Sequence, residues 1–192
     1  MPSPASSTAA ATNVFRRFRR NRRGSAAVEF ALVAPVFFAL LFAILETGIM
    51  FFASQVLETV TQDAARQVMT GQAQAAGYNT AANFKTNVIC TTNNVVNVLF
   101  DCANGIYIDV KNYPTFAGVV INSQIDAAGN FDPTTLAYQP GNSCDIVVAR
   151  LFYQWPIFVT GLGYNISNLS GSKRLLVATA AFRNEPYNGA CP

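Results

Sequence analysis

The sequence predicts an α+β protein in which a long N-terminal transmembrane helix packs on a small antiparallel sheet. Three observations lead to this fold class. Residues 25–53 form an apolar stretch long enough to span a membrane, an amphipathic helical pattern follows it, and the later chain holds short strands separated by turns. The length that remains beside the span suffices for one compact domain with its own core.

The apolar stretch follows directly on a basic run. As a helix, residues 25–53 would measure about 43 Å, against about 30 Å for the hydrocarbon core of a bilayer, so the stretch can span. Residues 54–93 hold only Arg66 and Lys85 as basic residues. By the positive-inside rule, the N-terminus is cytoplasmic and the chain from about Gln55 onward is extracytoplasmic. The basic residues that set this orientation are Arg16, Arg17, Arg19, Arg20, Arg22 and Arg23.

The composition excludes several classes of function. The segment before Ser25 carries six of the 13 basic residues and none of the 10 acids, so the later chain is net acidic and no nucleic-acid partner is expected. Histidine is absent, and no phosphate loop, metal-ligand cluster or nucleophile–base pair is found, so we expect neither an enzyme nor a cofactor. Asp101 and Asp109 could form an acid pair, but we interpret them as surface aspartates on a turn and on the outer face of a strand.

Four cysteines lie beyond the apolar stretch. An even number of cysteines in an oxidising compartment predicts two disulfides, and the wide spacing does not fit a zinc site. Three connectivities are possible. The short loop favours a bond between Cys90 and Cys102, which would leave Cys144 and Cys191 to tie the C-terminal tail to the domain.

Two carboxylates, Glu29 and Glu46, interrupt the apolar stretch. A charge within a membrane is costly unless it is paired or lies at the interface. We therefore treat each of the two carboxylates as a candidate functional residue. For Glu29 the alternative is a position at the cytoplasmic interface beside the arginines. The local order is a basic run, Gly24, four small or apolar residues, Glu29, Phe30 and then the hydrophobic helix.

This string resembles the processing site of type IV prepilins, and more closely that of the TadE-like pseudopilins of Tad (Flp) pili. The resemblance implies that a prepilin peptidase, an aspartate protease in the membrane, cuts on the cytoplasmic side between Gly24 and Ser25. It also implies that Glu29 pairs with the new N-terminal amine of a neighbouring subunit. Phe30 stands where the major Flp pilin has tyrosine, so the ring is kept and the hydroxyl is lost.

The resemblance extends to Pro35, to the run from Glu46 to Gly48 and to the tail from Phe182 to Tyr187. Pro35 removes one backbone hydrogen bond and predicts a helix kink, which a bilayer tolerates when neighbours satisfy the freed carbonyl. Glu46 lies about 25 Å beyond Glu29 along the helix, close to the outer membrane boundary. We therefore prefer an interfacial position for Glu46 to a buried pairing role.

The remaining elements follow from periodicity. Val56, Val60, Ala64 and Val68 recur every fourth residue, so the helix should continue to about Thr70 and stop at Gly71. Beyond it we expect short helices over residues 80–100, strands over 106–111, 145–154 and 174–183, and an exposed connection over 126–142. Three aromatic residues near the end of the second strand are interpreted as core residues rather than a binding patch: Tyr153, Trp155 and Phe158.

The resulting organisation has a basic prepilin-type leader at residues 1–24, a transmembrane helix at 25–53, an amphipathic extension at 54–76 and a periplasmic α+β domain at 77–192. The resemblance implies a pilin-like pseudopilin or minor pilin in the bacterial inner membrane, required for Tad pilus biogenesis and adhesion and carried to the surface pilus after assembly. Its partners would be the prepilin peptidase, other pilins and pseudopilins, the inner-membrane assembly platform and the lipid bilayer.

Two alternatives have different consequences. In the first, the chain is a permanently anchored single-pass protein whose outer domain binds a partner or an envelope polymer. In the second, residues 14–53 are a secretory signal that releases a soluble domain, but the A-x-A-like cleavage site that this requires is absent near Ala53.

Overall fold

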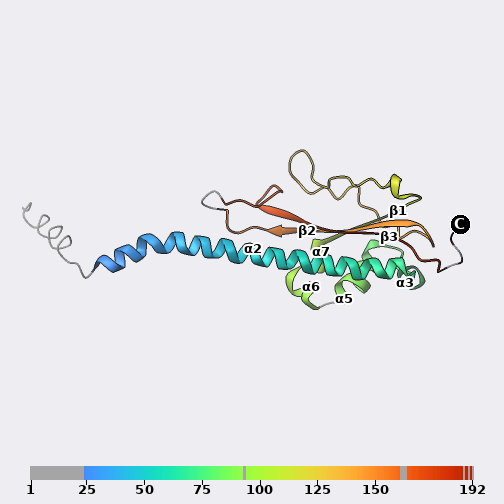
Figure 1. Ribbon diagram of the computed structural model, residues 1–192, viewed down its shortest axis with the longest axis horizontal. Coiled ribbons are helices and arrows are strands. Elements are labelled where there is room, and N and C mark those ends of the chain that lie inside the picture. Colours follow the sequence, from blue (N-terminus) through green and yellow to red (C-terminus); the bar gives the residue numbers. More distant parts are fainter. Residues whose placement is uncertain (1–23, 93, 161–163, 188, 190, 192) are drawn as a thin grey trace, which may run out of the picture. The chain divides into compact units, whose positions relative to one another are not determined.

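The computed structural model describes residues 24–92, 94–160, 164–187, 189 and 191. Residues 1–23, which include the six arginines of the expected leader, lie outside the described residues. The chain divides into two compact units, Met1–Ile44 and Leu45–Pro192. Figure 1 shows the elements in chain order, beginning with the long helix α2.

Helix α2 spans Ser25–Met69 and contributes residues to both units. It ends where the sequence predicts, because Gly71 adopts a left-handed conformation with φ 75°. A Cβ at this position would lie 2.5 Å from the ring of Tyr187. Glycine is therefore required at position 71 both for its backbone conformation and for the close approach of the tail.

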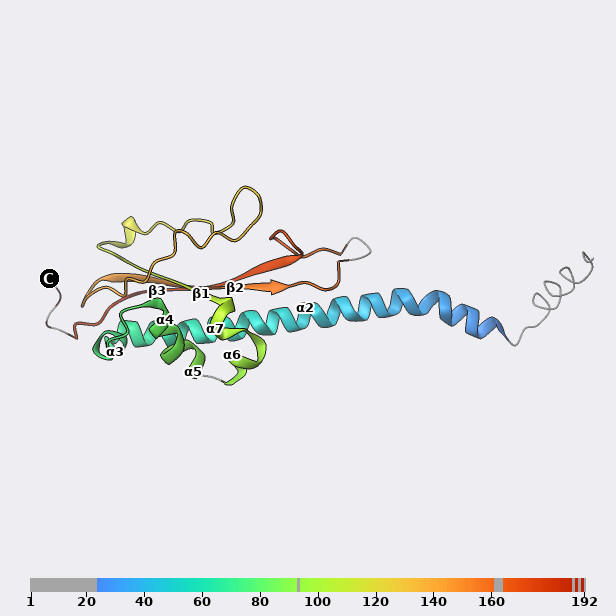
Figure 2. The same ribbon diagram turned by 180° about the vertical axis from the view of Figure 1, so that it is seen from behind.

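Short helices follow α2 and confirm the prediction for residues 80–100. Thr80 begins this region by accepting a hydrogen bond from the backbone N–H of Asn83 (3.2 Å), as an N-cap residue does. Figure 2 shows these helices beside the second half of α2. They are α3 (Gln72–Ala75), α4 (Ala81–Phe84), the π-helical turn η2 (Lys85–Ile89), α5 (Cys90–Thr92), α6 (Asn94–Leu99) and α7 (Cys102–Gly105).

A three-stranded antiparallel sheet completes the second unit and confirms the α+β class. The strands are β1 (Ile106–Tyr113), β2 (Ile146–Pro156) and β3 (Lys173–Arg183), in the order β1-β2-β3. In the register, Asp109 lies opposite Arg150, and Arg150 lies opposite Thr179. The three predicted strands are thus all present: β1 and β3 extend the predicted ranges, and β2 begins one residue later and ends two residues later than predicted.

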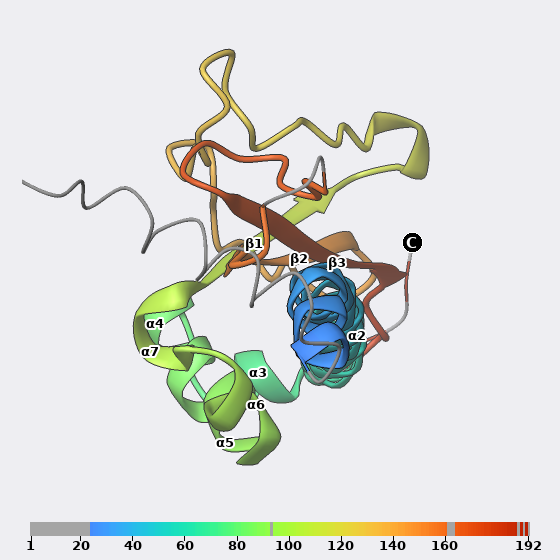
Figure 3. The same ribbon diagram turned by 90° about the vertical axis from the view of Figure 1, so that its left-hand side faces the viewer.

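The main core lies between the sheet and the helices. Figure 3 looks along α2 and shows the sheet on one side of it and the short helices on another. Ile106, Ile108 and Val110 point into this core, as the alternating pattern predicts. The second half of α2 contributes a buried stripe with helical spacing: Met50, Ala53, Leu57, Val60, Ala64 and Val68.

The opposite face of the sheet is covered by the long connection between β1 and β2. This connection contains the 3₁₀ turn η3 (Phe116–Gly118) and adds a second, smaller core. Residues 126–142, predicted to be an exposed connection, are therefore only partly exposed. The second core consists of Phe152, Leu169 and Leu175, against which Tyr107, Ile125, Phe131 and Leu136 pack.

Candidate functional site

The expected processing site lies at the start of α2. Gly24 is exposed and immediately precedes Ser25, the first residue of the helix. No atom lies within 4 Å of the position that a Cβ on Gly24 would occupy, so other described residues do not crowd this position. Among the described residues, the peptide bond between Gly24 and Ser25 therefore lies at the start of the helix, where Gly24 is exposed.

Glu29 and Phe30 follow one turn into the helix and are both exposed. Among the described side chains, none forms an ion pair with the Glu29 carboxylate. Pro35 also lies inside α2 and is exposed. The structure thus places these three residues on one continuous helix, whereas the roles of Glu29 and Phe30 and the kink at Pro35 stay predictions.

The helix around these residues presents apolar side chains on all sides. Leaving one such side chain in water instead of burying it forfeits about 1.5–3 kcal/mol, so a row of them requires an apolar surrounding. Within the described part of the chain, α2 is the one helix long and apolar enough to cross a membrane, and only 6% of its most apolar window is buried. The exposed members of this apolar belt are Val28, Phe30, Leu32, Val33, Val36, Phe37, Phe38, Leu40, Leu41, Phe42, Ile44, Leu45, Ile49, Phe51 and Phe52.

Glu46 has a set of partners that the sequence did not reveal. Its two carboxylate oxygens accept hydrogen bonds from the backbone N–H groups of Phe158 and Val159, the second at 3.0 Å. One residue further along α2, the hydroxyl of Thr47 shares a hydrogen bond with the hydroxyl of Tyr164. Glu46 and Thr47 thus fasten the connection between β2 and β3 to the helix, and we call this arrangement the Glu46 clasp. Its interfacial position in a membrane stays a prediction.

The C-terminal tail fastens the other end of α2. The backbone N–H of Glu185 donates to the carbonyl of Met69 (2.8 Å), which satisfies one of the orphan acceptors at the helix end. Asn184 is buried, and its side-chain amide donates to the carbonyls of Pro140 and Asn142. The tail that resembles the family is therefore the structural cap of the long helix.

Two disulfides reinforce this region and the short helices. Cys90 bonds to Cys102, and Cys144 bonds to Cys191. This is the connectivity that the short loop favours. The second bond closes a much longer segment than the first, with a sequence separation of 47 against 12, so it restricts the unfolded chain more strongly.

Asp109 is not the surface residue that the sequence predicts. It is 2% exposed and forms an ion pair with Arg150, which is 5% exposed, at 2.6 Å. Its other oxygen accepts from the backbone N–H of Ala137 (2.9 Å) and lies 3.3 Å from the ammonium of Lys111. Arg150 also donates to the carbonyl of Asn122 (3.0 Å). The prediction was wrong because the β1–β2 connection covers this face and is held there by these two charges.

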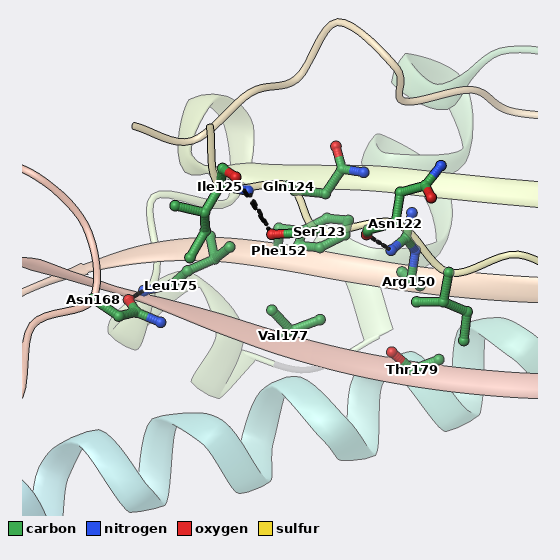
Figure 4. A pocket seen from close by; sticks show the side chains of 11 residues that line it. Asn122, Ser123, Gln124, Ile125, Arg150, Phe152, Asn168, Leu175, Val177 and Thr179 are labelled. Carbon is green, nitrogen blue, oxygen red and sulfur yellow. Dashed lines mark hydrogen bonds between the residues drawn. The ribbon is translucent and has the colours of Figure 1, made fainter. Parts of the chain in front are cut away.

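A small hollow of about 210 Å³ remains beside Arg150 on the same face. Figure 4 shows side chains of the β1–β2 connection above it and those of Val177 and Thr179 from β3 below. Ligand pockets usually measure about 300–1,000 Å³, and the guanidinium that lines this hollow is already engaged by Asp109 and Asn122. The hollow therefore shows no group that is both charged and available to a ligand.

Phe158 also differs from its predicted place. Tyr153 and Trp155 pack against the main core as expected, and their rings lie 4.8 and 6.3 Å from that of Phe100. Phe158, by contrast, is 82% exposed. The three aromatic residues therefore do not form one cluster, because the chain leaves the sheet at Pro156.

Comparison with known proteins finds one similarity, and it lies in the long helix. A family model described as TadE-like protein matches residues 24–66. The match begins at Gly24 and extends along α2 through most of its packed half, without reaching the sheet. No curated protein and no solved structure matches the chain. Over its segment from Gly24 to Arg66, the chain is similar to the TadE-like family, and this similarity supports an association with the Tad pilus system.

Proposed function

We propose that the chain is a pseudopilin or minor pilin of a Tad pilus. A prepilin peptidase cuts it between Gly24 and Ser25 on the cytoplasmic side of the bacterial inner membrane. The apolar half of α2 then holds the chain in the bilayer, and the α+β domain lies in the periplasm. In this proposal the protein acts without catalysis, through contacts with other pilins, pseudopilins and the assembly platform, in pilus biogenesis and adhesion.

The observation that carries the proposal is the coincidence of three boundaries at one position. The family match begins at Gly24, the long helix begins at Ser25, and the exposed apolar belt follows within the first turn. A cut at this junction would leave a mature chain that starts as an apolar rod. Such a rod can move within the membrane and pack against other subunits through it.

Glu29 would have a defined partner after the cut. It lies about 6 Å along the helix from Ser25, the residue that would carry the new ammonium group. A carboxylate and an ammonium are each costly in an apolar surrounding, and they offset one another when paired. If neighbouring subunits are staggered by about one turn, the amine of one meets Glu29 of the next.

The mature N-terminus tests the cut. Intact mass and N-terminal sequencing of the protein purified from its native membrane should give Ser25 as the first residue. The same protein from cells without the peptidase should retain Gly24 and the residues before it. A chain that keeps the leader in cells that make the pilus would contradict the proposal and favour a permanently anchored protein.

Glu29→Ala tests the assembly role separately. We expect the variant to be inserted in the membrane at the wild-type level but to abolish pilus assembly, measured as pili recovered by shearing. Glu58→Ala is the matched control, because Glu58 is exposed on the packed half of the same helix and should tolerate the change. Normal piliation by the Glu29→Ala variant would remove the pairing role.

A further inference from the structure

The connection between β2 and β3 meets α2 at a level where the helix is still apolar. The Glu46 clasp fixes Phe158 beside Glu46. Phe52, which is exposed, lies about 9 Å further along the helix, away from its N-terminus. Ile49 and Phe51 are exposed between these two levels. The connection therefore lies alongside the last turns of the apolar belt and not beyond its end.

Phe158 continues this belt onto the domain. Its side chain is 82% exposed even though Ile157, its neighbour in the chain, is buried in the main core. The hydrogen bond to Glu46 engages only the backbone of Phe158, and the side chain stays exposed. Any medium that covers Phe51 and Phe52 at this level is also available to the ring of Phe158.

The composition of this part of the chain suits the boundary of a bilayer. Residues 151–172 contain no charged side chain, so the connection carries no group that would oppose contact with lipid. In segments that lie at the membrane interface, apolar side chains such as Phe insert at the boundary between headgroups and acyl chains. Lys173 and Arg174 follow the uncharged run at once, and Lys173 is exposed, so its ammonium can reach lipid phosphates.

We propose that the β2–β3 connection is a second membrane contact, in which Phe158 inserts into the outer interface of the bilayer and holds the domain against it. The Glu46 clasp orients the connection by satisfying two backbone N–H groups that would otherwise face the apolar boundary. The proposal shares with the proposed function the insertion of α2 in the membrane, but it requires neither cleavage at Gly24 nor a pilus.

Depth-dependent quenching by brominated lipids tests this contact on the full chain. Trp155 is the single tryptophan, so a W155F background allows one reporter to be placed at a time. F158W reports on the proposed contact and F42W on the span. F116W is the matched control, because Phe116 is also exposed but lies on η3, which follows the end of β1 opposite Ile146 and therefore the end of the sheet away from Pro156.

The variants are reconstituted in vesicles of phosphatidylethanolamine and phosphatidylglycerol, with and without bromine on the acyl chains. We expect F42W and F158W to lose most of their emission, with F158W quenched best by bromine near the headgroups, and F116W to lose almost none. E46Q replaces one acceptor oxygen with a donor amide, so it should weaken the quenching of F158W and leave that of F42W unchanged.

Each contrary result has a separate meaning. If F42W is quenched and F158W behaves like F116W, the interfacial contact is wrong while the span stands. If F42W is not quenched, the insertion of α2 fails and the proposed function fails with it. Shielding of F158W that increases with the ratio of protein to lipid would assign Phe158 to a contact between copies and would overturn the proposal.

A second measurement avoids substitution in the connection. Lipids with a photoactivatable diazirine on the acyl chain label the wild-type chain, and mass spectrometry maps the labelled peptides. The proposal predicts labelling within residues 157–172 as well as in the apolar belt, and none around Phe116. Labelling confined to α2 would overturn it.

Discussion

Helix α2 has two halves that differ in what surrounds them. From Ser25 to Ile44 no residue of the helix is buried, although most are large and apolar. From Met50 to Val68 the helix buries one stripe against the sheet and the short helices and keeps polar residues such as Glu58 and Asp63 exposed. One continuous helix therefore has two surroundings: its second half packs on protein, and its first half exposes a surface that suits an apolar surrounding.

The difference between the two halves of α2 has a thermodynamic consequence. The stability of the domain should depend on the second half of α2 and on the sheet, and it should be insensitive to the first half. Assembly should show the opposite dependence. Substitutions in each half of α2, measured for their effects on domain stability and on assembly, test this difference.

The largest loss of stability is expected for Asp109→Ala. The change would leave the guanidinium of Arg150 buried without its partner, and breaking a buried pair in this way costs about 3–5 kcal/mol of unfolding free energy. Denaturant unfolding of the detergent-solubilised protein, followed by Trp155 fluorescence, measures it. Asp101→Ala should cost only about 1 kcal/mol, because Asp101 is exposed and caps one N–H of α7. Glu29→Ala should leave the unfolding free energy unchanged. Equal losses for Asp109→Ala, Asp101→Ala and Glu29→Ala would contradict the expectation that domain stability does not depend on the first half of α2.

A comparable or somewhat smaller loss is expected for Leu57→Ala, and its control lies in the other half of the same helix. Leu57 is 1% exposed, so the deletion leaves a cavity and should cost about 2–5 kcal/mol. Leu40 is 60% exposed, and Leu40→Ala should change domain unfolding by less than about 0.5 kcal/mol. The same unfolding experiment compares them, and similar losses would mean that the first half also packs on protein.

The smallest effect is expected for Tyr138→Phe, and it depends on pH. The Tyr138 hydroxyl is buried without a hydrogen-bond partner among the described residues, so its removal should be neutral or stabilise the domain by up to about 1 kcal/mol. Burial raises the pKa of Tyr138, and burial together with the charge of Asp145 raises the pKa of Tyr187.

A raised pKa favours the neutral phenol in the folded state. Its contribution to stability is fully present below about pH 10, the value for an unfolded tyrosine, and is lost as the pH rises through the folded-state pKa. Wild-type stability should thus fall above about pH 10, and Tyr138→Phe should make that decline shallower without removing the part due to Tyr187. Tyr113→Phe is the control, since its hydroxyl is exposed and donates to Val120. A decline unchanged by Tyr138→Phe would contradict this account.

Periodicity predicted the elements because it reports one buried face. The alternation of Ile106, Ile108 and Val110 identified both β1 and the side that faces α2. The same alternation placed Asp109 on the outer face and could not show that this face is covered. The cover comes from the β1–β2 connection, which has no periodic pattern and is held by the backbone of Asn122 and Ala137.

The parts of the site that could be predicted are those formed by residues close together in the sequence. The run from Gly24 to Phe30 carried the processing hypothesis, and the charge of Glu46 within an apolar stretch marked it as unusual. The partners of Glu46 are backbone N–H groups more than 100 residues later in the chain. Because every residue except proline has such a group, the sequence could not identify them. The sequence predicts a core position for Phe158 because aromatic residues that flank the end of a strand are usually buried, whereas the folded chain leaves its side chain 82% exposed.

The compartment of the C-terminus tests the central claim most directly. An alkaline phosphatase fused after Pro192 is active only outside the cytoplasm, and its activity in intact cells reports the side on which the domain lies. The account predicts an active fusion, because the arginine-rich segment should stay inside and α2 should cross the membrane once. An inactive, full-length fusion would place the domain in the cytosol and would contradict the membrane span, the periplasmic domain and the proposed role in a pilus.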